Sequence, residues 1–166
     1  MNPFLLWLES TAFSTWVRES PSVFAFPAIL SCHTVGMGLV AGINASLALR
    51  ILGVGPGIAI HEMKRFFPVM WFGFWLNAIS GVILLIAYPT KALTNPVFYL
   101  KLTLVAIAIA LVKPIGRRVF GDPMPDRDPT AGGVKRLAVT SLVCWAGVII
   151  SGRLLAYTYS RLMQGF

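Results

Sequence analysis

Residues 66–88 form the run FFPVMWFGFWLNAISGVILLIAY, which contains no charged side chain and is followed by Pro89. About 20 consecutive apolar residues are enough for an α-helix to cross the hydrocarbon core of a bilayer. Three further apolar runs lie at about residues 22–49, 96–112 and 137–159. The sequence therefore predicts an all-α, polytopic membrane protein with four transmembrane helices.

The composition of the chain supports a membrane environment. Of its 166 residues, 57% are hydrophobic and 12% are charged, whereas soluble domains carry roughly 25% charged residues. The net charge of +8 fits the excess of basic residues that membrane proteins place in cytoplasmic loops. No basic stretch is interleaved with aromatic residues as a nucleic-acid groove requires. We therefore expect the lipid bilayer, and no nucleic acid, as the partner of this chain.

The N-terminal residues 2–19 have an amphipathic pattern. Phe4, Leu8 and Trp16 recur at helical spacing, whereas Glu9 lies elsewhere around the helical turn. No basic region precedes the apolar residues and no small-residue cleavage site follows them, which is not the pattern of a signal peptide. We expect an interfacial helix that lies along the membrane surface before the first span.

The distribution of Lys and Arg predicts the orientation of the spans. Segment 114–135 is rich in Pro and Gly and is expected to be a hydrophilic loop. The loops after spans one and three hold nine basic residues, and the opposite side holds three: Arg50, Lys64, Arg65, Lys113, Arg117, Arg118, Arg127, Lys135 and Arg136 against Arg18, Lys91 and Arg161. Because basic loops stay in the cytoplasm, both termini are predicted on the periplasmic or outer side.

Small residues recur every four positions on the first two spans. The two stripes are Gly38, Gly42 and Ser46 on span one, and Gly73, Asn77 and Gly81 on span two. Such stripes let helices approach closely. They offer more close-packing surface than one four-helix bundle needs, so we expect a homo-oligomer or an assembly with other membrane subunits.

A few polar side chains lie within the spans. His33 and Asn77 are near the middle of their runs, and Lys101 and Arg153 lie about 6 and 9 Å to the outer side of the centres of theirs. No acidic residue lies within any span. The two cations either extend to the outer interface or bind an anion, such as a lipid phosphate, a substrate carboxylate or the propionates of a haem. Four converging polar groups could line one cavity.

His33 is the strongest candidate for a site, because an imidazole cannot reach far toward water. Met37 lies one turn further along the same helix face, and a His–Met pair can bind haem iron or a soft copper ion. The alternatives are a hydrogen bond to a neighbouring helix, a quinone or a transported solute. His61 lies beside the basic residues at the cytoplasmic interface, whereas His33 lies about halfway across the hydrocarbon core, which is roughly 30 Å thick. The two histidines are therefore too far apart to share one haem.

Three segments carry a family resemblance: residues 30–38 (LSCHTVGMG), 71–74 (WFGF) and 95–101 (NPVFYLK). They resemble an uncharacterised family of bacterial four-helix inner-membrane proteins, which is loosely similar to the membrane domain of copper-resistance D proteins and to small b-type cytochromes. The resemblance implies the bacterial inner membrane, four helices and a family-type histidine at His33.

The sequence contains no phosphate-binding loop, nucleophile elbow or paired histidines with a glutamate, so nothing indicates an enzyme acting on its own. We expect a small membrane subunit that binds haem b, copper or another ligand and takes part in redox chemistry or ligand binding. Its predicted site consists of His33, Met37, Asn77, Lys101 and Arg153, with His33 and Met37 as metal ligands. The alternatives are a non-catalytic accessory or assembly subunit and a transporter of copper or a small anion.

Overall fold

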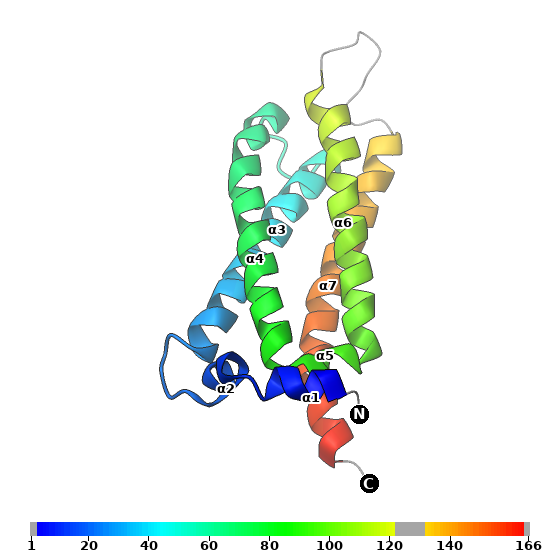
Figure 1. Cartoon of the computed structure of the whole chain (residues 1–166). Helices are drawn as coiled ribbons and strands as arrows, with labels where there is room; N and C mark the ends of the chain where they lie inside the picture. The colour runs from blue at the N-terminus through cyan, green and yellow to red at the C-terminus, as the bar shows by residue number, and fades with distance from the viewer. Residues whose placement is uncertain (1–2, 122–131, 165–166) are drawn as a thin grey trace.

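Four long helices dominate the computed structural model, which describes residues 3–121 and 132–164 (Figure 1). They are α3 (Phe26–Ile51), α4 (Phe67–Ala87), α6 (Pro96–Phe120) and α7 (Gly132–Gln164), and the 3-10 helix η1 (Ile60–Phe66) precedes α4. Each is long and apolar enough to span a membrane, and only 17–33% of their apolar stretches is buried inside the bundle. Most apolar side chains thus face outward, as in a multi-pass membrane protein. The described residues form no strand, and the predicted fold class is confirmed.

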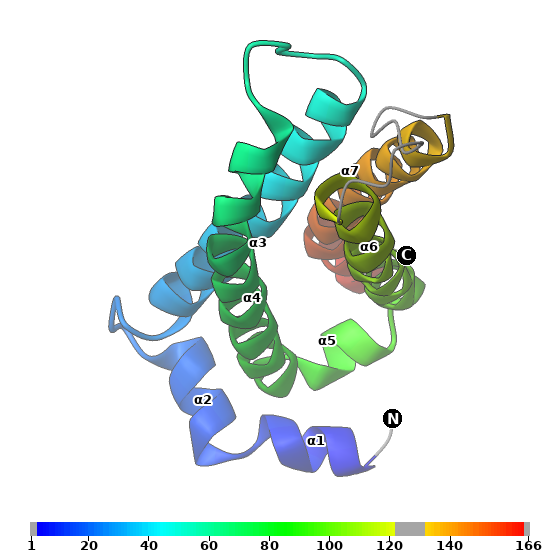
Figure 2. The same cartoon turned by 90° about the horizontal axis from the view of Figure 1, so that it is seen from above.

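The four long helices form two hairpins that pack along one side only. α3 pairs with α4, α6 pairs with α7, and α3 and α7 join the two hairpins. The backbones of α4 and α6 do not pack closely against each other, and Figure 2 shows α5 (Pro89–Leu93) between their ends. Side chains bridge the two helices, since the ring of Phe67 on α4 packs against Phe120 on α6 with centroids 5.4 Å apart.

The closest approach of two helices lies between α3 and α4. A Cβ added to Gly36 would lie 2.6 Å from Asn77 N and 2.7 Å from Gly73 O, so only glycine fits there. The predicted small-residue stripe on α4 thus packs against α3. The predicted stripe on α3 does not pack within the chain, because Gly38 and Gly42 have open space around them.

Buried side chains of α3, α6, α7 and η1 form two apolar layers. The layer beside η1 contains Leu47, Ala48, Ile51, Met63, Ile115, Val134 and Ala138. The middle layer contains Val40, Ala41, Ala108, Cys144, Trp145 and Val148. Seven residues make two helical turns, so one further step of seven from Val40, Ala108 and Trp145 leads to His33, Lys101 and Gly152.

The N-terminal segment forms two helices instead of the single helix predicted for residues 2–19. They are α1 (Pro3–Glu9) and α2 (Ala12–Glu19), and they lie across the end of the bundle at which both termini are found (Figure 1). The break is at Thr11, whose hydroxyl accepts a hydrogen bond from Ser14 N at 3.3 Å and caps α2. The capped turn changes the direction of the chain, so that α2 packs against α4 and α1 packs against both α4 and α5.

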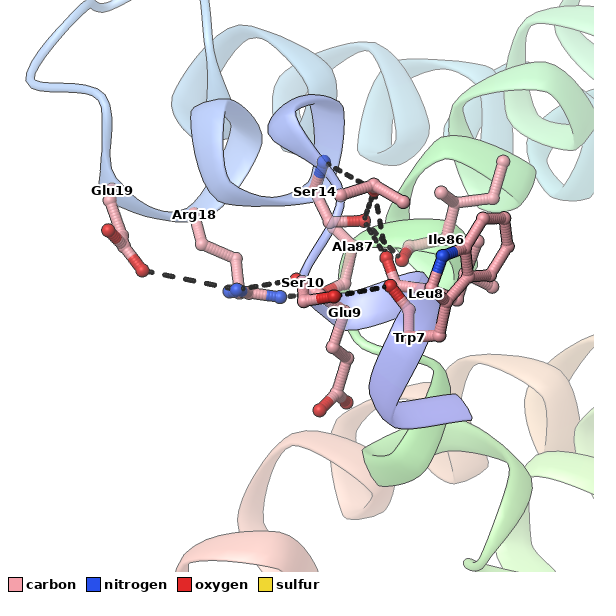
Figure 3. A network of polar contacts seen from close by, with 10 residues as sticks. Trp7, Leu8, Glu9, Ser10, Ser14, Arg18, Glu19, Ile86 and Ala87 are labelled. Carbon is pink, nitrogen blue, oxygen red and sulfur yellow. Dashed lines mark hydrogen bonds and ion pairs between the residues drawn. The ribbon is translucent and has the colours of Figure 1, made fainter. Parts of the chain in front are cut away.

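Side chains of α2 cap the carboxyl end of α4 (Figure 3). The last four carbonyls of a helix have no partner within the helix. Ser14 Oγ donates to Ile86 O at 2.9 Å, and Arg18 Nη1 donates to Ala87 O at 3.0 Å. The polar face of α2 therefore satisfies the end of a transmembrane helix.

Glu9 joins α1 to α5, which lies beside it. Its Oε1 accepts a hydrogen bond from Thr90 N at 3.1 Å, in the first turn of α5. Arg18 Nη2 donates to Glu9 O at 2.9 Å (Figure 3). These bonds fix α1, α2 and α5 as one unit over the end of the bundle.

Two predicted boundaries of the loop 114–135 are wrong. α6 continues through Pro114 to Phe120, and α7 begins at Gly132, while residues 122–131 lie outside the described part of the chain. An interior proline removes one helical hydrogen bond and crowds the carbonyl four residues earlier, but the basic Arg117 and Arg118 in the last turn interact favourably with the helix dipole. The helix can therefore extend beyond its apolar stretch.

Candidate functional site

His33 lies at the α3–α4 interface, with one edge of its ring facing α4. Its Nδ1 is 3.0 Å from Asn77 O and 3.2 Å from Ser80 Oγ. A backbone carbonyl only accepts hydrogen bonds, so Nδ1 carries the ring proton and donates it to Asn77 O. The other nitrogen, Nε2, is then an acceptor.

Asn77 completes the contact from the α4 side. Its side-chain Nδ2 donates to His33 O at 2.7 Å. The two residues thus exchange hydrogen bonds between their side chains and backbones. Gly81 provides the space for the ring, because a Cβ there would lie 3.1 Å from His33 Cε1. This reciprocal pairing holds the imidazole in a single orientation.

Lys101 of α6 contacts the opposite edge of the His33 ring. Its Nζ lies 3.4 Å from His33 Nε2, and its side chain passes Gly152 of α7, where a Cβ would be 3.9 Å from Nζ. An ammonium group only donates, which matches the acceptor role of Nε2. No carboxylate of the described residues forms an ion pair with Lys101. A half-buried cation therefore lies beside the imidazole, with donors left over.

The other predicted site residues lie elsewhere. Met37 is part of the apolar packing around the middle layer, where it contacts the group that contains Val40 and Trp145. Arg153 is exposed on α7, and the residue that faces Lys101 is its neighbour Gly152. The structure thus unites His33, Asn77 and Lys101 and leaves Met37 and Arg153 outside the polar cluster.

His61 is separated from His33, as its position in the sequence predicts. It lies in η1 at the opposite end of the bundle, where its exposed ring is 3.4 Å from the carboxylate of Glu62. The two histidines belong to different sites.

No group of three or more His, Cys, Asp or Glu side chains in the described part of the chain could hold a metal ion. A metal at His33 would bind through Nε2, since Nδ1 is engaged by α4, and Lys101 would have to move away from it. Haem and copper binding stay predictions.

Ser80 and Gly152 are site residues that the sequence analysis missed. Ser80 is three residues after Asn77 and so lies on the same face of α4. Gly152 is found by the seven-residue steps on α7 from Ala138 through Trp145, which match the steps that lead to His33 and Lys101. The seven-residue spacing that the apolar layers share on α3, α6 and α7 could have predicted that Gly152 lies at the level of His33 and Lys101.

The fold and the cluster define a multi-pass helical protein with a polar site between its two hairpins. No protein-family model, curated protein or solved structure matches the chain. The suspected family therefore stays a prediction, and function has to be argued from the cluster itself.

Proposed function

We propose that this protein is a small membrane subunit that binds an anionic ligand at the cluster of His33, Asn77, Ser80 and Lys101. The contact between Lys101 and His33 carries the proposal. A cation inside an apolar bundle is costly unless a counter-charge or several hydrogen bonds compensate for it. Lys101 has the imidazole as an acceptor and no described carboxylate as a counter-ion. A ligand carboxylate or phosphate would supply the missing charge.

A ligand that enters from the lipid would reach the cluster between α4 and α6, whose backbones do not pack closely against each other. α6 carries Lys101, and α3 and α4 carry the imidazole and its partners. A lipid-soluble molecule with one acidic group could place that group at Lys101 and leave its apolar part between the hairpins. A haem, through a propionate, also belongs to this class, as does an acidic lipid.

Orientation and location are part of the same proposal. Both termini lie at one end of the bundle, and η1 and the basic last turn of α6 lie at the other (Figure 1). The Lys and Arg bias supports a cytoplasmic position for the basic end. We place the protein in a bacterial inner membrane, with its termini and the cluster toward the periplasm.

The test is to identify what co-purifies with the protein in mild detergent. The visible spectrum is recorded first, because a Soret band identifies haem. Extracted small molecules are then compared by mass spectrometry between the wild type, Lys101→Met and Arg153→Met. Arg153→Met removes an equal charge from a transmembrane helix outside the cluster. We expect an acidic ligand that Lys101→Met loses and Arg153→Met retains.

An accessory or assembly subunit is the second candidate function. Both imidazole nitrogens already have partners within the chain, which supports a purely structural cluster. A colourless, ligand-free wild type, or equal retention in both variants, would reject the ligand-binding proposal in favour of this one.

A further inference from the structure

An open surface pocket lies at the opposite end of the bundle from the His33–Lys101 cluster. It has a volume of about 390 Å³, opens to the surroundings, and is lined by Phe67 and Trp71 of α4 and Val112, Lys113, Gly116 and Arg117 of α6. The proposed function uses none of these residues. We propose that this cavity, called the α4–α6 pocket, binds the headgroup of an anionic phospholipid.

The walls of the α4–α6 pocket are held in place by aromatic contacts. The ring of Phe67 packs edge-on against Phe120 with centroids 5.4 Å apart, and Trp71 packs against Phe74 at 5.5 Å. Gly116 leaves the space open, since a Cβ there would meet Phe67 only at 3.8 Å. Aromatic packing therefore fixes the positions of the apolar side chains that line the pocket.

Two cations stand at the rim of the α4–α6 pocket. Lys113 and Arg117 are exposed and are one helical turn apart on α6, which is about 6 Å along the axis. Neither forms an ion pair with a carboxylate of the described residues, and Glu62 is paired with Arg65 at 3.2 Å. The charge of the rim is thus complementary to a phosphate.

The position of the rim along α6 favours a lipid over a soluble anion. Lys113 is the first charged residue after the apolar stretch of α6, so it marks the boundary between hydrocarbon and headgroups. Tryptophan is enriched at that depth, and Trp71 lies in the same pocket. From there the acyl chains can extend into the bilayer along the outward-facing apolar surface of the spans. A choline headgroup would bring its own cation to the rim, so an anionic headgroup fits better.

The test is native mass spectrometry of lipid adducts on the whole protein, with phosphatidylglycerol and phosphatidylcholine of the same acyl chains. We expect the wild type to retain phosphatidylglycerol in preference. Lys113→Gln combined with Arg117→Gln should weaken that adduct about tenfold or more, since each basic residue near a membrane surface contributes to anionic lipid binding. Lys64→Gln combined with Arg118→Gln removes the same charge at the same end but outside the pocket lining, and should change it less than about twofold.

Gly116→Leu tests the cavity without a change of charge. Its side chain would occupy the pocket, so adducts of both lipids should fall while circular dichroism shows intact helices. Glycerol phosphate at the same concentration should not displace the lipid, because it lacks the acyl chains. Displacement by glycerol phosphate would overturn the lipid proposal and indicate a soluble phosphate ligand.

Two further results would overturn the proposal. One is an equal loss of phosphatidylglycerol in the rim variant and the control variant, which would indicate a general charge effect. The other is a preference that appears only after Asp122, Asp126 and Asp128 are replaced by Asn, which would indicate that the chain's own acids neutralise the rim.

Discussion

Lys101 Nζ lies 3.4 Å from His33 Nε2, and this contact links two helices that belong to different hairpins. The proton on Nδ1 is committed to Asn77 O, so Nε2 offers its lone pair to the ammonium group. The imidazole belongs to α3 and is oriented by its hydrogen bond to α4, and α6 carries the ammonium group of Lys101. An anion that binds Lys101 therefore has to accept from the remaining ammonium protons, because Nε2 presents only a lone pair.

Replacing His33 should affect both a bound ligand and the stability of the bundle. His33→Ala removes the hydrogen bond to Asn77 O and frees Lys101 from its acceptor. We expect loss of any bound species and a destabilisation of about 1 kcal/mol, the net value of one hydrogen bond. Co-purified ligand and the thermal midpoint in detergent are the measurements.

His61→Ala is the matched control for His33→Ala. Its ring is exposed, and water can replace its contact with Glu62. We expect no change in ligand or midpoint. Equal effects of the two substitutions, or an unchanged ligand in His33→Ala, would reduce His33 to a packing residue.

The apolar pattern of the sequence was sufficient to predict the four long helices, because a run such as residues 66–88 has no other stable environment than lipid. It could not predict the break at Thr11. That break depends on the local hydrogen bond between Thr11 and Ser14 N and on the contact of Ser14 with Ile86 O at the end of α4. It also could not show that α6 passes Pro114, since a proline inside a helix costs about 3 kcal/mol and more often ends or kinks the helix.

The depth of the polar residues predicted only part of the cluster. His33, Asn77 and Lys101 meet, whereas Arg153 lies at a comparable depth and faces outward. Depth gives the level of a residue in the membrane but not its direction around the helix. Direction follows from the seven-residue register of α7, which places Gly152, and not its neighbour, opposite Lys101.

Gly36→Ala should destabilise the α3–α4 hairpin. The added methyl group would lie 2.6 Å from Asn77 N and 2.7 Å from Gly73 O, and these backbone atoms cannot move aside without separating the helices. Overpacking of this kind costs about 1–3 kcal/mol. The thermal midpoint should fall, and the hydrogen bonds between His33 and Asn77 should weaken with it.

Gly42→Leu provides the contrast, because Gly42 has open space within the chain. The substitution should leave the midpoint of the monomer unchanged. If the exposed stripe packs against a second copy, the mass measured in mild detergent should fall from that of an oligomer to that of a monomer. A wild type that is monomeric from the start would contradict the expected homo-oligomer.

Cysteine labelling tests the proposed orientation. Asn2→Cys and Pro125→Cys are introduced separately into a chain in which Cys32 and Cys144 are replaced by Ala. A membrane-impermeant thiol reagent added to intact cells should reach position 2 and not position 125, because the basic loops are expected in the cytoplasm. Labelling of position 125 from outside would reverse the orientation.

Arg18→Met should loosen the end of the bundle that the N-terminal helices cover. Arg18 donates to Ala87 O at 3.0 Å and to Glu9 O at 2.9 Å, and methionine keeps the apolar stem without the donors. Hydrogen bonds from a charged donor contribute about 1.5–3 kcal/mol each, and the partial exposure of Arg18 puts the expected loss near the lower end. Proteolysis between α2 and α3 and the thermal midpoint report the change.

Glu19→Gln separates capping from ion pairing at Arg18. Glu19 approaches Arg18 Nη2 only to 3.9 Å, and its side chain is 68% exposed. Exposed ion pairs contribute little, so this variant should behave as the wild type. If Glu19→Gln and Arg18→Met destabilise the protein equally, the carbonyl caps are not what fixes α2 to α4. If only Arg18→Met does so, the end of a transmembrane helix depends on a side chain from a helix that lies outside the span.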